Sequence, residues 1–137
     1  MTLVDSNVLL DVITVGQRWA AWSERALERA ALNGPLLIND VIYAEISARY
    51  SAFETLDELL DVNSIALTPM PRAALFLAGK TFIRYRSAGG LRTGVLPDFF
   101  IGAHAAVMDL PLLTRATRRY RTYFPTVTLI APDETGV

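Results

Sequence analysis

The chain has 137 residues, of which 52% are hydrophobic and 20% are charged. This composition predicts one domain with a real core over residues 1–137 and excludes a disordered chain. The absence of cysteine excludes disulfides and thiolate chemistry, and no apolar run approaches the ~20 residues that a membrane span needs. No basic residue precedes an apolar core at the N-terminus, so we expect no signal peptide, a cytoplasmic location and no membrane partner.

The net charge of −1 is unevenly distributed along the chain. Residues 1–79 carry five arginines and ten acids, whereas residues 80–123 carry Lys80 and seven arginines against Asp98 and Asp109. An acidic pole beside an arginine-rich half fits a metal site that handles a phosphate backbone. An ordinary solvated surface with ion pairs would carry the same charges, so this alternative stays open.

Short apolar runs alternate with segments whose apolar residues recur at helical spacing. In chain order we expect a strand at 2–4, helices at 6–15 and 18–32, a strand at 36–38, helices at 41–50 and 53–60, a strand at 65–67, helices at 70–87 and 98–108, a strand at 112–114, a helical turn at 118–123 and a last strand at 127–130. This alternation predicts an α/β fold with a mostly parallel sheet of four to five strands.

Asp5 stands where the first strand ends and a helix begins. Ligands of parallel sheets bind at the carboxyl ends of the strands, so an acid at this place is a candidate for chemistry. Asp5, Ser6 and Asn7 are also good helix caps, because their side chains can accept hydrogen bonds from free backbone N–H groups. The two interpretations of Asp5, helix cap and site residue, both remain open from the sequence.

Glu45 lies inside the helix expected at 41–50. Its neighbours on the helix face are the small or apolar residues Val41, Ala44 and Ala48. A carboxylate on such a face is costly unless it is paired, hydrogen-bonded or bound to a cation. The alternative is a glutamate at the exposed border of that face.

Asp98 follows Pro97 at the start of another expected helix, a pattern that suits any helix N-terminus. One turn later comes Gly102, which costs ~1 kcal/mol relative to alanine in a helix interior. We expect Gly102 to leave open space beside the Asp98 carboxylate. His104 is the only histidine, which makes a zinc site implausible, and we expect it to be a packing or surface residue.

Four motifs in this order resemble a PIN domain, and their spacing and the chain length resemble the VapC toxins of bacterial toxin–antitoxin pairs. The motifs are Val4-Asp5-Ser6-Asn7-Val8-Leu9, Glu45 in its apolar helix, Pro97-Asp98-Phe99-Phe100-Ile101-Gly102-Ala103 and Leu113-Thr114-Arg115. The resemblance covers nearly the whole chain. It implies a three-layer α/β/α sandwich, a divalent-metal-dependent ribonuclease and inhibition by a cognate antitoxin.

The residues that match the acids of the family are Asp5, Glu45 and Asp98. We expect Asp5 and Asp98 to ligate Mg²⁺ or Mn²⁺, the ions that oxygen ligands favour, and Glu45 to be a ligand or a base that orients water. All three are therefore expected to be catalytic. We expect four further residues to contact the substrate: Ser6, Asn7, Thr114 and Arg115.

The chain departs from the family at Ala116, where the family usually has aspartate and sometimes asparagine. The leading hypothesis is an endoribonuclease toxin, a homodimer with RNA and antitoxin as partners, whose cleavage is weakened by the missing acid. The alternatives are a form of the fold that binds RNA and antitoxin without turnover, and a scaffold whose acids are caps and surface charges. For Trp19, Trp22 and Phe53 we expect core packing rather than a partner surface.

Overall fold

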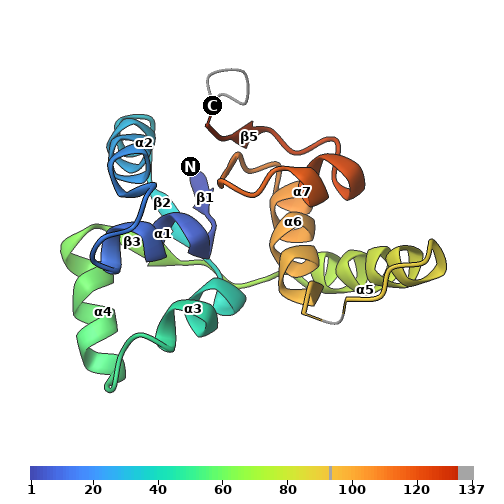
Figure 1. Ribbon diagram of the computed structural model, residues 1–137, viewed down its shortest axis with the longest axis horizontal. Coiled ribbons are helices and arrows are strands. Elements are labelled where there is room, and N and C mark those ends of the chain that lie inside the picture. Colours follow the sequence, from blue (N-terminus) through green and yellow to red (C-terminus); the bar gives the residue numbers. More distant parts are fainter. Residues whose placement is uncertain (93, 133–137) are drawn as a thin grey trace.

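The computed structural model describes residues 1–92 and 94–132 (Figure 1). Five strands form one sheet in the order β3–β2–β1–β4–β5, and every neighbouring pair is parallel. The strands are β1 (Thr2–Val4), β2 (Leu36–Ile38), β3 (Ile65–Leu67), β4 (Leu112–Leu113) and β5 (Leu129–Ile130). The expected α/β fold with a parallel sheet is confirmed.

Seven helices connect the described strands. They are α1 (Ser6–Ile13), α2 (Ala20–Leu32), α3 (Asp40–Ser47), α4 (Phe53–Val62), α5 (Arg72–Ser87), α6 (Leu96–Met108) and α7 (Arg118–Tyr123). Right-handed crossovers place helices on opposite faces when the chain moves in opposite directions along the sheet. The chain moves from β1 to β3 through α1, α2 and α4 and returns across the sheet to β4 and β5 through α5, α6 and α7. Figure 1 shows α2 and α4 at the left and α5, α6 and α7 at the right, in agreement with three layers. Helix α3 packs against both α1 and α6, so it joins the two outer layers.

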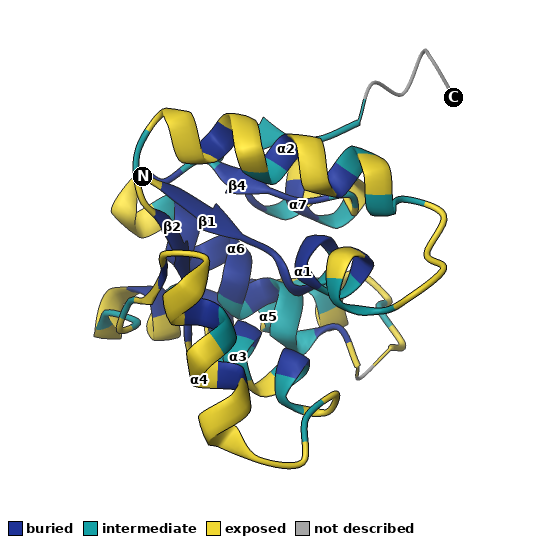
Figure 2. Cartoon of the chain, turned by 90° about the vertical axis from the view of Figure 1, so that its left-hand side faces the viewer, coloured by how far each residue is buried: buried dark blue, intermediate teal, exposed yellow. Residues whose placement is uncertain are grey.

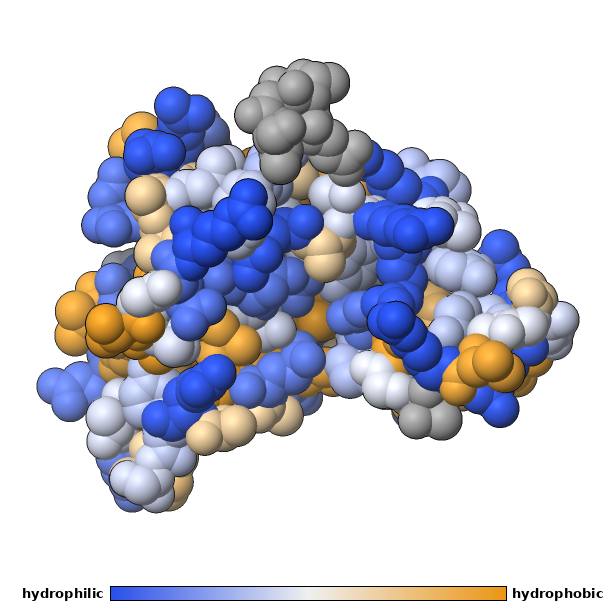
Figure 3. Space-filling model, in the orientation of Figure 1, coloured by the Kyte–Doolittle hydropathy of each residue, from blue (hydrophilic) through white to orange (hydrophobic). Residues whose placement is uncertain are grey.

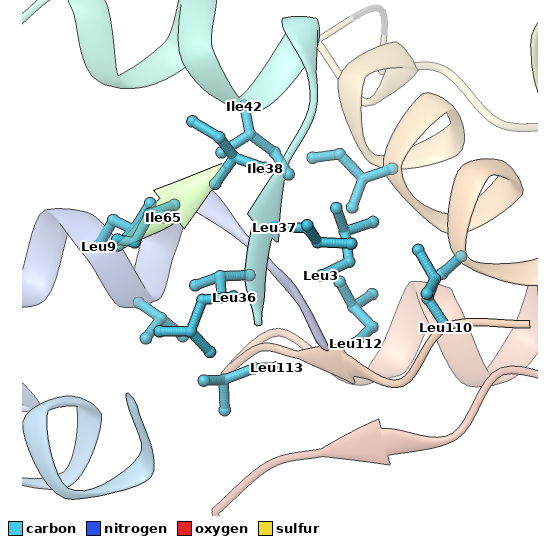
Figure 4. Close-up of a cluster of buried hydrophobic side chains, with 14 of the residues drawn as sticks. Leu3, Leu9, Leu36, Leu37, Ile38, Ile42, Ile65, Leu110, Leu112 and Leu113 are labelled. Atoms are coloured by element: carbon cyan, nitrogen blue, oxygen red, sulfur yellow. The ribbon is translucent and has the colours of Figure 1, made fainter. Parts of the chain in front are cut away.

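The core is built on the three central strands, which are buried on both faces (Figure 2). Leu36 and Leu37 point to opposite faces of β2 and contribute to both halves of the core (Figure 4). This double burial explains why the strands read as continuous apolar runs rather than as alternating ones. No described helix has the length and apolarity that crossing a bilayer requires.

The element boundaries differ from expectation by a few residues, and local chemistry explains the differences. Helix α3 begins at Asp40 because the Asn39 side chain caps it, accepting a hydrogen bond from the Ile42 N–H at 2.9 Å. Helix α6 begins at Leu96, two residues early, with Pro97 in its first turn. Asp98 therefore lies inside the first turn of α6 rather than at its start.

Two expectations about packing are wrong. A Cβ atom at Gly102 would overlap the ring of Phe124, so Phe124 fills the space that was expected to lie open beside Asp98. Phe53 is 66% exposed because it is the first residue of α4 and projects into solvent. Trp22 packs against the core as expected, whereas Trp19 is half-buried and contacts the Trp22 ring in a T-shaped arrangement. His104, expected to be a packing or surface residue, is fully buried.

Candidate functional site

Asp5 directly follows β1 at the carboxyl edge of the sheet and is only 3% exposed. It occupies the position before α1, yet its side chain makes no capping hydrogen bond. Its Oδ2 instead accepts hydrogen bonds from the Thr114 hydroxyl and the Tyr120 hydroxyl, both at 2.8 Å. The interpretation of Asp5 as a helix cap is therefore wrong, and its carboxylate belongs to the sheet edge.

Glu45 reaches the same edge from α3. Its Oε1 accepts a hydrogen bond from Ser6 Oγ at 2.9 Å, and the same hydroxyl lies 3.4 Å from Asp5 Oδ1. One serine side chain thus lies between two carboxylates that are 40 residues apart in the sequence. Glu45 is half-buried because α3 packs against both α1 and α6.

Asp98 comes from the first turn of α6 and is partly exposed. Its Oδ2 is paired with the Arg119 guanidinium, which comes from α7. Asp98 and Arg119 are each 27% exposed. The third acid of the site therefore has a cationic partner, whereas no ion pair of Asp5 or Glu45 occurs within residues 1–92 and 94–132.

Burial and neighbouring charges shift the pKa values of the three carboxylates. Burial raises the pKa of Asp5, of Glu45 and of Asp98 above the ordinary values. The negative charge of Asp98 raises the pKa of Asp5 further, and the charges of Asp5 and Asp98 do the same to Glu45. The Arg119 guanidinium lowers the pKa of Asp98 and so opposes the effect of burial there, but it is not among the causes of the pKa shifts of Asp5 and Glu45. Asp5, Glu45 and Asp98 thus form one electrostatic cluster, as the sequence suggested.

Tyr120 is a residue of the site that the sequence did not reveal. It is 1% exposed, and burial together with the charges of Asp5, Asp98 and Glu45 raises its pKa well above the ordinary value of 10.0. The phenol therefore stays protonated and can donate its hydrogen bond to Asp5. The sequence assigns no site role to Tyr120, because its contact with Asp5 joins residues 115 apart in the chain.

Three of the four expected substrate-contact residues surround Asp5. Besides Ser6 and Thr114, Asn7 donates from Nδ2 to Thr114 Oγ1 at 3.1 Å and lies 3.3 Å from Asp5 Oδ2. Asn7 Oδ1 also accepts a hydrogen bond from the Arg115 backbone N–H at 3.1 Å. These polar side chains fix the chain after β4 against the start of α1.

The guanidinium of the fourth residue, Arg115, is paired with Asp11 and not with the acids of the cluster. Its Nε and Nη2 donate to the two oxygens of Asp11 at 2.5 and 2.9 Å, and its cationic carbon lies 5.6 Å from the centre of the Trp19 ring. Asp11 is 3% exposed and also accepts a hydrogen bond from Ser23 Oγ at 2.6 Å. The Arg115 side chain therefore joins α1 to α2 and does not reach the three clustered acids.

A cleft of about 490 Å³ opens beside Asp98. Basic and aromatic side chains predominate among the residues that line it, which are Tyr85, Arg92, Asp98, Ala116, Thr117, Arg118, Arg119, Thr122 and Tyr123. Figure 3 shows strongly hydrophilic residues over α7 in this part of the surface. Ala116 is exposed and lines the same cleft as Asp98, so a longer acidic side chain at this position would face the site.

The oxygen-rich cluster fits a hard divalent cation by its chemistry. Within residues 1–92 and 94–132, no three acidic or histidine side chains are arranged to hold one ion as they stand. Asp5 and Glu45 are joined through Ser6, whereas Asp98 is turned to Arg119. The negative charge of Asp98 raises the pKa of Asp5, and those of Asp5 and Asp98 raise the pKa of Glu45, so a cation bound among these carboxylates would relieve their repulsion.

Comparison with known proteins places the chain in a family. The family model described as PIN domain matches residues 2–125, whereas no curated protein matches the sequence. Among solved structures, the chain is similar to VapBC2 from Rickettsia felis bound to a DNA fragment from their promoter, with 18% identity over 96% of this chain and 98% of that chain and a TM-score of 0.72.

Two further structures show the same likeness. A toxin–antitoxin complex from Klebsiella pneumoniae has 22% identity over 98% of this chain and 99% of that chain, with a TM-score of 0.66. FitAcB from Neisseria gonorrhoeae has 20% identity over 95% and 96% of the two chains, with a TM-score of 0.58. At these identities the likeness is one of fold.

Proposed function

Because the chain belongs to the PIN domain family, we propose that it is a divalent-metal-dependent endoribonuclease and the toxin of a toxin–antitoxin pair. The observation that carries the proposal is the cluster of buried Asp5 with the partly buried Glu45 and Asp98 at the carboxyl edge of β1. Burying carboxylates that repel one another opposes folding, and a cation-dependent reaction gives a reason to keep them there.

Asp5, Glu45 and Asp98 are the residues that would hold Mg²⁺ or Mn²⁺, which when bound polarises a phosphoryl oxygen and makes water a better nucleophile. Thr114 and Tyr120 hold Asp5 Oδ2 in place by their hydrogen bonds. Glu45 is our choice for the general base, because burial raises its pKa, which makes the carboxylate a stronger base, and its partner Ser6 holds only one carboxylate oxygen.

The arginine-lined cleft is proposed to hold the RNA backbone. Arg92 and Arg118 line it together with Arg119, and guanidinium groups bind phosphates through paired hydrogen bonds. The affinity for single-stranded RNA should therefore fall steeply with salt. Fluorescence anisotropy at several salt concentrations measures this, and a flat salt dependence would argue against the cleft.

The test of catalysis is cleavage of structured RNA in Mn²⁺ by the wild type and two variants. Asp5→Asn should reduce the cleavage rate by about 100-fold or more, as removal of a catalytic group does. Glu58→Gln changes an exposed acid on α4 and is the matched control. Equal rates in the three proteins, or cleavage that persists in chelator, would contradict the proposal.

Ala116 favours a second candidate function, in which the chain binds RNA and antitoxin without turnover. A fourth carboxylate beside Asp98 would strengthen the attraction for a cation, so Ala116→Asp should raise the cleavage rate by about tenfold or more. If neither protein cleaves RNA while both bind it with the same affinity, the binding module is the better account. Robust and equal cleavage by both would show that position 116 is dispensable.

An antitoxin is the proposed protein partner, as in the toxin–antitoxin complex from Klebsiella pneumoniae. An apolar groove of about 620 Å³ runs between α1 and α2 on one side and α3 and α4 on the other, with Glu24 and Glu28 among its lining residues. We expect an amphipathic antitoxin helix with basic residues to lie there. Val12→Asp, an exposed change in this groove, should prevent a co-expressed antitoxin from relieving growth inhibition.

A second copy of the chain is proposed to cover α5. This helix extends away from the sheet (Figure 1), and Phe76 and Ile83 on it are 68% and 60% exposed. Apolar residues two turns apart lie on one helix face, as in helix pairs between subunits. Sedimentation should give a dimer for the wild type and a monomer for Phe76→Asp.

A further inference from the structure

We propose that Arg119 is an internal competitor of the divalent ion: its guanidinium neutralises Asp98 in the metal-free protein and must leave that carboxylate when the ion binds. This inference rests on the metal-dependent function proposed above. It assigns to Arg119 the control of how tightly the site binds metal, a role separate from any contact with RNA.

The first observation is the uneven distribution of positive charge in the site. The Arg119 guanidinium is paired with Asp98 Oδ2, and no described ion pair joins a cation to Asp5 or Glu45. Asp5 is held by hydroxyl groups and Glu45 by the Ser6 hydroxyl. A guanidinium is therefore already paired with Asp98, whereas Asp5 and Glu45 have no described cationic partner.

The second observation concerns the arrangement of the donors. In the described part of the chain, no three acids are disposed to hold one ion, and the acid that is engaged by a different cation is Asp98. The ion pair is not deeply buried, because both side chains are 27% exposed. Arg119 can therefore move from Asp98 into the adjoining cleft without passing through the apolar core, and partly exposed ion pairs are weak enough to exchange.

The third observation is the position of the neighbouring residue. Arg119 and Tyr120 are consecutive in α7 and reach two different acids of the site, Asp98 and Asp5. The buried Tyr120 hydroxyl anchors α7 to Asp5 and leaves the backbone of Arg119 in place while its side chain changes partner. Once it has left Asp98, the guanidinium lies among the other arginines of the cleft, where a phosphate is its natural ligand.

The experiment measures the affinity of the full chain for Mn²⁺ alone, without RNA, by equilibrium titration. Arg119→Met keeps most of the length of the side chain and removes its charge, so it should bind Mn²⁺ about tenfold more tightly than the wild type. Arg118→Met is the matched control: Arg118 lines the same cleft from the preceding position and is exposed. Its removal should change the affinity by about twofold at most, because its charge is screened by water.

A charge-preserving variant separates competition from loss of structure. Arg119→Lys retains the positive charge and should bind Mn²⁺ as weakly as the wild type, and Asp5→Asn should bind least of all. Unchanged or weaker binding in Arg119→Met would overturn the inference while the proposed function stands. Absence of Mn²⁺ binding in every variant, including the wild type, would overturn both.

Discussion

Asp5 and Asp11 lie six residues apart beside the same helix and are both 3% exposed, yet their surroundings are opposite. Asp11 has a guanidinium on both oxygens and a serine hydroxyl in addition. Asp5 is held by neutral hydroxyl and amide groups, and the charge that shifts its pKa is that of another acid, Asp98. Equal burial is therefore compatible with two different surroundings, one with a described ion pair at Asp11 and one without at Asp5.

This difference in partners predicts that the stability of the fold depends more on Asp11 than on Asp5. Removing one partner of a buried ion pair leaves the other charge uncompensated, so Asp11→Asn should lower the free energy of unfolding by about 3 kcal/mol. Asp5→Asn removes a charge that is repelled by its neighbours and should change the unfolding free energy by less than about 1 kcal/mol. Urea denaturation of the two matched variants measures both values. Equal losses would remove the distinction between the two residues.

The effect of a divalent ion on the melting temperature should also depend on Asp5. A ligand that binds only the folded state stabilises it, so Mn²⁺ at about 100 times its dissociation constant should raise the melting temperature of the wild type by roughly 5–10 °C. The shift should vanish in Asp5→Asn and persist in Glu58→Gln. An identical shift in all three proteins would mean that the ion binds elsewhere.

The two aspartates also show what the sequence could and could not predict. Asp5 could be assigned to the sheet edge because strand end, helix start and acid are adjacent in the chain. The partners of both aspartates could not, because Tyr120 and Arg115 lie 115 and 104 residues from their acids. Which face of α7 or of the loop before it meets α1 depends on tertiary packing. The expectation of open space beside Gly102 was wrong for the same reason, because the ring that fills this space belongs to Phe124, which is remote in the sequence.

Because the pKa of Asp5 is raised in the folded protein, the contribution of Asp5 to the free energy of unfolding should fall as the pH rises. The folded protein binds more protons than the unfolded chain above the ordinary value of 3.8, so this contribution is present in acid and is lost as the pH rises through the raised pKa. In chelator, the stability of the wild type relative to Asp5→Asn should therefore decline as the pH rises above 3.8 and through the raised pKa. Thermal unfolding of both proteins across this range checks it, and a parallel pair of curves would contradict it.

His104 should give a smaller effect of the opposite sign. The Asn39 amide group lies 3.1 Å from His104 Nδ1 and donates to it, because Asn39 Oδ1 already caps α3, and burial lowers the pKa of His104. Stability is therefore lost as the pH falls below the ordinary value of 6.5 towards the lowered pKa. His104→Gln, which retains an acceptor for Asn39, should flatten the curve between pH 5 and 7 by less than about 1 kcal/mol.

The placement of β4 between β1 and β5 has a consequence for synthesis. Thr114 and Tyr120, which hold the Asp5 carboxylate, follow it by 109 and 115 residues, and β1 pairs with a strand that begins at Leu112. Contacts of such separation form late and slowly. A nascent chain on the ribosome therefore carries all three acids before it has the segment that organises them, and acquires its complete centre only when α7 has emerged.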